Sequence, residues 1–214
     1  MNKIVLCAGG HARVVIEALQ SRKLTPAGVT DAEIALMGKL IAGIPVIGTD
    51  EVIDKMTPQS VQLANGLGNN AKPFNSGLAR RRELFERFVA KRFRFPPVMH
   101  ASATVASNAV ISDGAQLMAG SIVQAGASVG MNTIVNTGAI IEHDCKLGPH
   151  VHVAPGAILC GNVTVAEETH IGAGAIVLQG LLVGRLAVIA AGIVVRRNVR
   201  DGETIGTHNS ANES

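Results

Sequence analysis

Two histidines in the second half of the chain lie in a pattern suited to proton transfer. His143 is followed directly by Asp144, and His152 comes nine residues later. Imidazole titrates near neutral pH, and a neighbouring carboxylate orients the ring and raises its basicity. These residue types fit a general base with an acidic partner, provided that the fold leaves both side chains accessible.

A six-residue repeat dictates how the surrounding chain must fold. From Val105 to Val195 every sixth residue, sixteen positions in all, is Val, Ile or Leu. Twelve of the sixteen have a small residue two positions earlier, and fourteen have Gly, Asn, Asp or His three positions later. The latter four types adopt positive φ most readily, so each short strand should end in a corner. The repeat predicts a triangular parallel β-helix with eighteen residues per coil.

The repeat frame also predicts where the histidines point. Val151 and Val153 should face inward, so His152 between them should face outward. His143 should stand one residue before a corner. His152 and His170 are one coil apart and should stack on one wall, where they could also be two ligands of a metal.

Three residues near the histidines have structural alternatives. Asp144 fills a corner position, so it could serve the turn alone instead of the imidazole. His150 fills the same kind of position, and there the structural interpretation is favoured. Cys145 occupies an inward position for a small residue, which favours packing over nucleophilic catalysis.

The first hundred residues have the pattern of a small Rossmann-like α/β domain with a parallel sheet. A buried strand at 3–6 leads through Cys7-Ala8-Gly9-Gly10-His11 into an amphipathic run at 12–20, where free N–H groups could hold a diphosphate, although a plain turn is the alternative. A strand at 27–30 ends at Asp31, and residues 61–70 end a third strand in Gly and Asn. Two such strand ends on one sheet edge predict a ligand crevice.

Composition and local sequence predict the domain boundaries, the partners and the location of the protein. Pro96-Pro97 separates a domain at 1–97 from the β-helix at 98–200 and a tail at 201–214. The basic run at 80–94 is expected to be a solvated helix face, and with no Trp or Tyr we expect no nucleic-acid partner. The longest apolar run, at 186–195, falls short of the ~20 residues that span a bilayer. With three unpaired cysteines, a cytoplasmic location without membrane contact is expected.

The organisation as a whole resembles the hexapeptide-repeat, left-handed β-helix acetyltransferases that act on nucleotide-linked amino sugars in the sialic-acid, bacillosamine and perosamine pathways. The resemblance implies a homotrimer with active sites at subunit interfaces, acetyl-coenzyme A as co-substrate and no metal. It implies His143 as general base, Asp144 as its acidic partner and His152 beside acetyl-coenzyme A. Further cofactor contacts are implied at Ala173, Gly174 and Ala191. Nucleotide-sugar contacts are implied at Gly9, Gly10, His11, Asp31, Gly68 and Asn69.

The expected reaction is N-acetylation of a 4-amino-4,6-dideoxy sugar on its nucleotide carrier, for a bacterial surface polysaccharide or glycan. O-acetylation of a sialic acid is the alternative, because a hydroxyl acceptor requires the same base at the same distance. Two alternatives from other classes are a carbonic-anhydrase-like β-helix metalloenzyme and a nucleotide-sugar-binding protein without catalysis.

Overall fold

A computed structural model describes residues 2–69, 75 and 77–206. The N-terminal part contains one sheet with strand order β3-β4-β2-β1-β5. Its elements are β1 (Asn2–Leu6), α1 (Gly10–Gln20), β2 (Gly28–Thr30), a 3-10 helix (Ile34–Leu36), β3 (Leu40–Ile41), β4 (Ile44–Gly48), α2 (Glu51–Asp54), β5 (Val61–Asn65) and α3 (Ala79–Ala90).

The sheet is parallel, as expected, except at one edge. β1, β2, β4 and β5 pair in parallel, whereas β3 pairs antiparallel with β4, because Ala42 and Gly43 join the two strands in a tight hairpin with positive φ. Helix α1 buries Val15, Ile16 and Leu19 on one face of the sheet. Four phenylalanines from α3 and the segment after it pack on the other face: Phe85, Phe88, Phe93 and Phe95.

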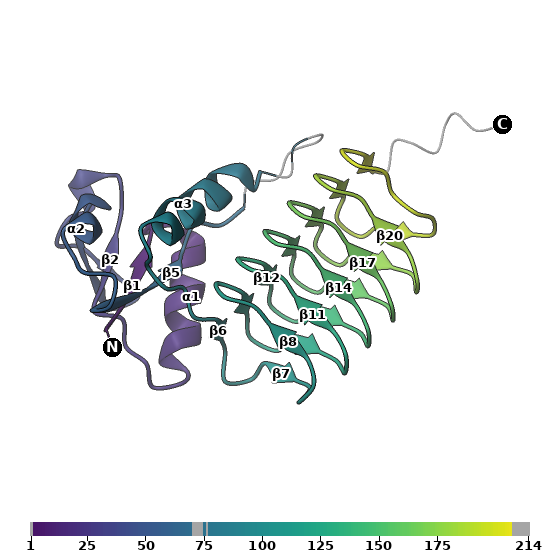
Figure 1. Ribbon diagram of the computed structural model, residues 1–214, viewed down its shortest axis with the longest axis horizontal. Helices are drawn as coiled ribbons and strands as arrows, with labels where there is room; N and C mark the ends of the chain where they lie inside the picture. The colour runs from purple at the N-terminus through teal and green to yellow at the C-terminus, as the bar shows by residue number, and fades with distance from the viewer. Residues whose placement is uncertain (1, 70–74, 76, 207–214) are drawn as a thin grey trace.

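The second part is a triangular parallel β-helix whose two-residue strands form three sheets. Figure 1 shows its coils extending away from the α/β domain. The first wall contains β6 (Val98–Met99), β9 (Gln116–Leu117), β12 (Ile134–Val135), β15 (His152–Val153), β18 (His170–Ile171), β21 (Val188–Ile189) and β23 (Thr204–Ile205). The second contains β7 (Thr104–Val105), β10 (Ile122–Val123), β13 (Ile140–Ile141), β16 (Ile158–Leu159), β19 (Ile176–Val177) and β22 (Val194–Val195). The third contains β8 (Val110–Ile111), β11 (Ser128–Val129), β14 (Lys146–Leu147), β17 (Thr164–Val165) and β20 (Leu182–Val183).

The register confirms the six-residue frame. Strands one coil apart pair in parallel at a spacing of eighteen residues, as His152 does with His170. From Leu117 to Val195 every residue of the frame is buried in one core, and small residues such as Ala127 and Cys145 share that core. The β-helix is therefore filled by stacked aliphatic side chains and needs no aromatic residues.

The corners also follow the prediction, and positive φ occurs at two further corners whose residue types did not predict it. Gly, Asn, Asp or His adopts positive φ at the corner position in most coils, including Asp144 (61°) and His150 (59°). Glu168 and Leu186 do so as well, although neither residue type favours that region. A non-glycine residue there costs roughly 1–2 kcal/mol, so another contact must offset it.

The β-helix extends further along the chain than the predicted boundary at residue 200. β23 pairs with β21, so the last described strand belongs to the first wall and not to a tail. Residues 207–214 of the predicted tail lie outside the described residues. Among residues 2–69, 75 and 77–206, no helix is long and apolar enough to cross a lipid bilayer.

Candidate active site

Helix α3 docks on one row of β-helix corners, formed by Gly114, Asn132, His150 and Glu168 at eighteen-residue intervals. We call this row the docking column. A side chain at Gly114 would collide with the Phe85 ring, so glycine there admits the helix. The other three corner side chains all bond to α3 or lie beside its polar groups. Three corners with positive φ, at Asn132, His150 and Glu168, thus contribute contacts between the two domains.

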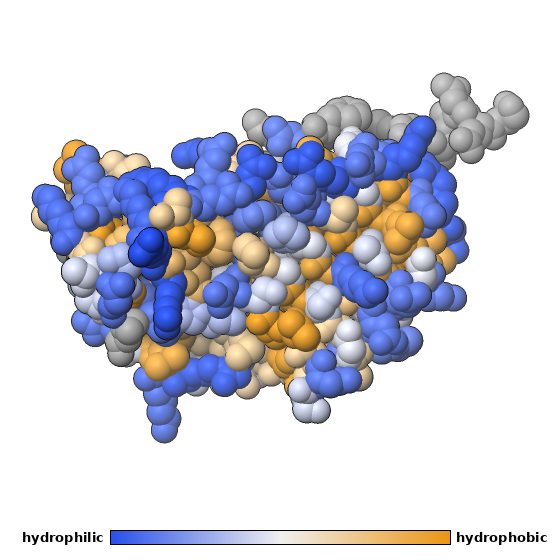
Figure 2. Space-filling view, viewed as in Figure 1, coloured by the Kyte–Doolittle hydropathy of each residue, from blue (hydrophilic) through white to orange (hydrophobic). Residues whose placement is uncertain are grey.

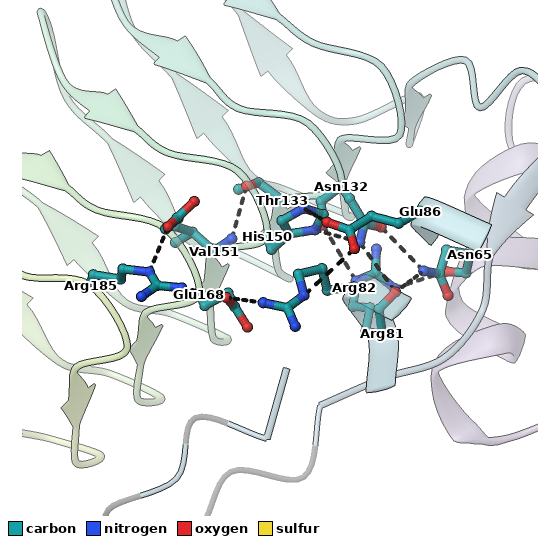
Figure 3. A network of polar contacts seen from close by, with 11 residues as sticks. Asn65, Arg81, Arg82, Glu86, Asn132, Thr133, His150, Val151, Glu168 and Arg185 are labelled. Carbon is teal, nitrogen blue, oxygen red and sulfur yellow. Dashed lines mark hydrogen bonds and ion pairs between the residues drawn. The ribbon is translucent and has the colours of Figure 1, made fainter. Parts of the chain in front are cut away.

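Arg81 lies at the centre of this interface and is fully buried. It is the exception in the basic run at 80–94, whose other basic residues are exposed as expected, apart from the half-buried Arg82. The Arg81 guanidinium donates to the carbonyls of Asn65 (3.0 Å) and Leu67 (2.6 Å), both at the end of β5, and more weakly to that of Asn132 (3.4 Å). Figure 3 shows it between Asn65 and Asn132. Burial lowers the pKa of Arg81 to about 9, so it stays cationic at neutral pH. Its contacts fix the loop that follows β5.

Glu168 is held by two cations. Arg82 Nη1 lies 2.5 Å and Arg185 Nη2 3.6 Å from the nearly buried Glu168 carboxylate, and Figure 3 shows all three together. A charge-assisted hydrogen bond of this kind offsets the cost of positive φ at Glu168. Nearby, Asn132 Nδ2 lies 3.0 Å from His150 Nδ1, so the structural interpretation of His150 is sound: it joins a corner to the interface.

A pocket of about 660 Å³ opens between the α/β domain and the first wall of the β-helix. It unites the two glycine-rich strand ends of the sheet with His152 from the wall. Its lining includes all six residues predicted to contact a nucleotide-sugar: Gly9, Gly10, His11, Asp31, Gly68 and Asn69. A Cβ at Gly9 or Gly10 would meet nothing within 4 Å, so the turn faces open space. Asp31 Oδ2 accepts the N–H of Ala8 at 2.7 Å and shapes that turn.

Two polar residues in this region were not predicted from the sequence. Gln116 Nε2 donates to Asn65 O at 2.7 Å, and its Oε1 lies 2.7 Å from His11 Nε2. Asn136 Nδ2 lies 3.2 Å from His152 Nε2. The repeat could have identified Gln116, because this residue occupies the position of His152 two coils of eighteen residues earlier.

His152 is tied to the α/β domain through Asn69. The Asn69 amide nitrogen lies 3.1 Å from His152 Nδ1 and 2.8 Å from His170 Nδ1. The two rings lie on one wall, as the repeat predicted, with centroids 5.0 Å apart and planes tilted by 55°. Burial, reinforced by His170, His11 and Arg81, lowers the pKa of His152 well below its ordinary value. The ring is therefore neutral and offers one donor and one acceptor nitrogen. Within the described residues no cluster of three His, Cys, Asp or Glu side chains could hold a metal. His152 and His170 instead share the side-chain amide of Asn69.

His143 and Asp144 form a pair on a different edge of the triangle, between the second and third walls. His143 Nδ1 lies 2.9 Å from Asp144 Oδ2, and both side chains are more than half exposed. Because the carboxylate accepts the Nδ1–H, Nε2 is left bare and can accept a proton. Asp144 thus serves the imidazole as well as the corner.

The described chain brings some predicted residues together and keeps others apart. Ala173, Gly174 and Ala191 line the edge between the first and second walls, above His152. Gly174 N–H is already bonded to Pro155 O, whereas the N–H groups of Ala173 and Ala191 have no acceptor among the described residues. His143 does not line the pocket. One chain alone therefore does not bring His143 to the pocket.

Cys145, adjacent to the pair, is a packing residue, as expected. It is fully buried, its thiol donates to Cys160 O at 3.1 Å, and burial raises its pKa to about 11. A neutral, buried thiol is a poor nucleophile, because the thiolate is the reactive form.

Acidification is expected to destabilise the protein through its buried histidines. Burial lowers the pKa of His11, His150 and His170 to about 4, and that of His152 also falls. Between about pH 6.5 and pH 4 these histidines are protonated in the unfolded chain but not in the folded chain. The free energy of unfolding is therefore unaffected above pH 6.5 and decreases as the pH falls towards 4. The loss is about 1.4 kcal/mol per pH unit for each histidine. Tm measured from pH 7.5 to 4.5 should fall steeply below pH 6.5, and less steeply in His170→Gln. A flat profile would contradict this.

The triangular β-helix, the outward His-Asp pair and the attached α/β domain together define an acyltransferase of the hexapeptide-repeat class. Residues 3–73 match the PglD N-terminal domain family. The chain is 34% identical to the acetyltransferase domain of PglB from Neisseria gonorrhoeae, solved with acetyl coenzyme A, over 95% of this chain and 94% of that one, with a TM-score of 0.86. It therefore belongs to the left-handed β-helix acetyltransferase family that includes PglB.

Two further solved structures are similar over almost the full length. A variant of GDP-perosamine N-acetyltransferase from Caulobacter crescentus, in complex with CoA and GDP-perosamine, is 30% identical over 97% of this chain and 95% of that one, with a TM-score of 0.87. WeeI from Acinetobacter baumannii, at 22% identity, covers 97% and 98% with a TM-score of 0.82 and shares the fold. Comparison with the curated proteins gave no match.

Proposed function

We propose that the protein transfers the acetyl group of acetyl-coenzyme A to the amino group of a nucleotide-linked 4-amino-4,6-dideoxy sugar. The observation that carries this proposal is the pocket that joins the strand ends at Gly9, Asp31 and Asn69 to His152 on the β-helix. A similar protein, the Caulobacter enzyme, is described with CoA and GDP-perosamine bound.

The turn before α1 is suited to the diphosphate of the nucleotide. The helix begins at Gly10 with no side-chain cap and no acidic residue in its first turn, so its first N–H groups are available to an anion. Gly9 and Gly10 leave open space in front of them. The sugar would then extend from this turn towards His152.

Acetyl-coenzyme A would lie along the edge above His152. The N–H groups of Ala173 and Ala191 can donate to the pantetheine arm or to the thioester carbonyl, whose oxygen becomes negative during attack. The sugar amine forms the new C–N bond, the thiolate of coenzyme A leaves, and His143 Nε2 takes the proton from the amine.

We further propose that the active site forms between subunits of a trimer. His143 and the pocket occupy different edges of one triangular chain, so a neighbour must supply one of them. The outward positions of the second wall form an apolar row that could meet another chain: Ile122, Ile140, Ile158, Ile176 and Val194. Figure 2 shows apolar patches between polar side chains on the β-helix half of the face in view. Three unpaired cysteines support a cytoplasmic location.

A substrate panel tests the proposed reaction. Nucleotide-linked amino sugars with uridine, guanosine or thymidine carriers are each incubated with acetyl-coenzyme A, and release of free thiol is measured. One amino sugar should be acetylated far faster than sialic acid or a hydroxyl analogue. Preference for the hydroxyl acceptors would support O-acetylation instead, and no thiol release with any acceptor would contradict both.

A variant in the pocket tests whether the nucleotide-sugar binds there. Gly10→Leu places a side chain in open space, so the fold is preserved while the pocket is filled. The KM for the preferred nucleotide-sugar should rise by more than about tenfold, while the KM for acetyl-coenzyme A stays unchanged. An unchanged KM for the nucleotide-sugar would place its site elsewhere.

A further inference from the structure

The His143-Asp144 pair rests against neighbouring coils at two glycines. Eighteen residues after His143 stands Gly161, and eighteen residues before Asp144 stands Gly126. The backbone of the pair is held from both sides, because Asn162 N–H donates to His143 O at 2.8 Å and Asp144 N–H donates to Ala125 O at 3.0 Å. These bonds fix the backbone of the pair. The orientation of the two side chains therefore depends on the space around them.

Gly161 supplies that space for the imidazole. A Cβ at this position would overlap His143 Nε2 and lie 2.6 Å from Cε1 and 3.1 Å from Cδ2. Contacts under 3.0 Å are not observed for real Cβ atoms, so the ring would have to move. The nitrogen left bare for proton transfer is thus the atom nearest to the missing side chain.

The reason for glycine at 161 differs from that at other wall glycines. At Gly130, Gly148 and Gly172 a Cβ would collide with backbone atoms of the next coil. At Gly161 the three nearest atoms all belong to the His143 ring. Gly161 also lacks the positive φ that favours glycine at position 126, where a Cβ would lie 2.5 Å from Asp144 Oδ1. Its backbone can accept alanine, so the imidazole alone explains this glycine.

We propose that Gly161, together with Gly126, is a positioning residue for the base: the two glycines leave the gaps in which the His143 ring and the Asp144 carboxylate face each other. This inference rests on the proposed role of His143. It assigns a function in proton transfer to a residue that has no side chain.

The test is Gly161→Ala in two backgrounds. In the wild-type chain the displaced ring should lower kcat about 10- to 100-fold, with the KM of both substrates within about twofold. In the His143→Ala background the same change should lower kcat no further, because the ring through which it acts is gone. Gln179→Ala, an exposed position one coil beyond Gly161, is the control and should keep kcat within about twofold.

The outcomes separate this inference from the function on which it rests. A Gly161→Ala variant with wild-type kcat, or one that loses kcat equally in both backgrounds, would overturn the positioning role while leaving His143 as the base. Wild-type kcat in His143→Ala alone would overturn the proposed base and the positioning role with it. Loss confined to the background that contains His143 supports both.

Discussion

Replacing His143 with alanine is expected to lower kcat about 10³-fold, within the range for losing a general base. The imidazole holds its Nδ1 against Asp144 and leaves Nε2 free, but it does not line the pocket. The KM of each substrate should therefore change little, since binding groups are untouched. Thiol release under saturating acetyl-coenzyme A and acceptor measures this. A variant that keeps near wild-type kcat would show that another group takes the proton.

Asp144→Asn provides the graded comparison. Asparagine also tolerates positive φ, so the corner at 61° is kept while the negative charge is lost. We expect about a tenfold fall in kcat, because the ring loses its orientation and charge stabilisation but remains in place. An effect as large as that of His143→Ala would mean that the corner had collapsed, and the Tm of the variant would reveal it.

Mixing a base variant with a pocket variant, assayed at a nucleotide-sugar concentration well below the KM of the pocket variant, tests whether neighbouring subunits share the site. His143→Ala subunits keep an intact pocket, and Gly10→Leu subunits keep an intact base. In randomly mixed trimers, about a quarter of the sites would combine the good base of one chain with the good pocket of the next. Recovery of activity on mixing supports a shared site. No recovery, or a monomer in solution, would contradict it.

Arg81→Met is expected to lower the free energy of unfolding by about 3 kcal/mol, because buried carbonyls at the end of β5 lose a charged donor. Leu67 O is left without its short bond, and Gly68 and Asn69 follow it directly in the pocket. We therefore also expect a higher KM for the nucleotide-sugar, with little change for acetyl-coenzyme A. Urea unfolding and steady-state kinetics measure the two effects.

Two variants test whether the burial of Arg81 explains its effect on the free energy of unfolding. Arg87, on the same helix, is exposed and pairs with Asp50 and Asp54, so Arg87→Met should cost less than about 1 kcal/mol. Arg81→Lys keeps the charge but loses the planar fork that spans two carbonyls, and it should recover only part of the stability. If Arg81→Met were as stable as Arg87→Met, the interface would not depend on this cation.

The repetitive half of the fold could be predicted in detail because its information is local. A branched residue every sixth position and a turn-forming residue three positions later determined the core, the corners and the outward direction of His152. The strand ends of the α/β domain could be located for the same reason, since glycine and asparagine there follow short buried strands.

The domain interface could not be predicted, because its contacts join residues far apart in sequence. Arg81 looked like one cation in a basic run, and only its position opposite Asn132 buries it. Glu168 looked like an exception to the corner rule until Arg82 was placed beside it. Asn69 was predicted for the sugar pocket, yet its link to His152 depends on how the two domains dock.

The docking column has a consequence for how this molecule can change in length. Its members share one face only because every turn contains the same number of residues. Inserting a single residue into a strand would exchange the inward and outward positions of all later side chains and shift Glu168 away from Arg82. Viable length variants must therefore add or remove complete turns, or extrude the surplus as a loop at a corner. Homologous β-helices without such loops should differ in length by whole multiples of eighteen residues.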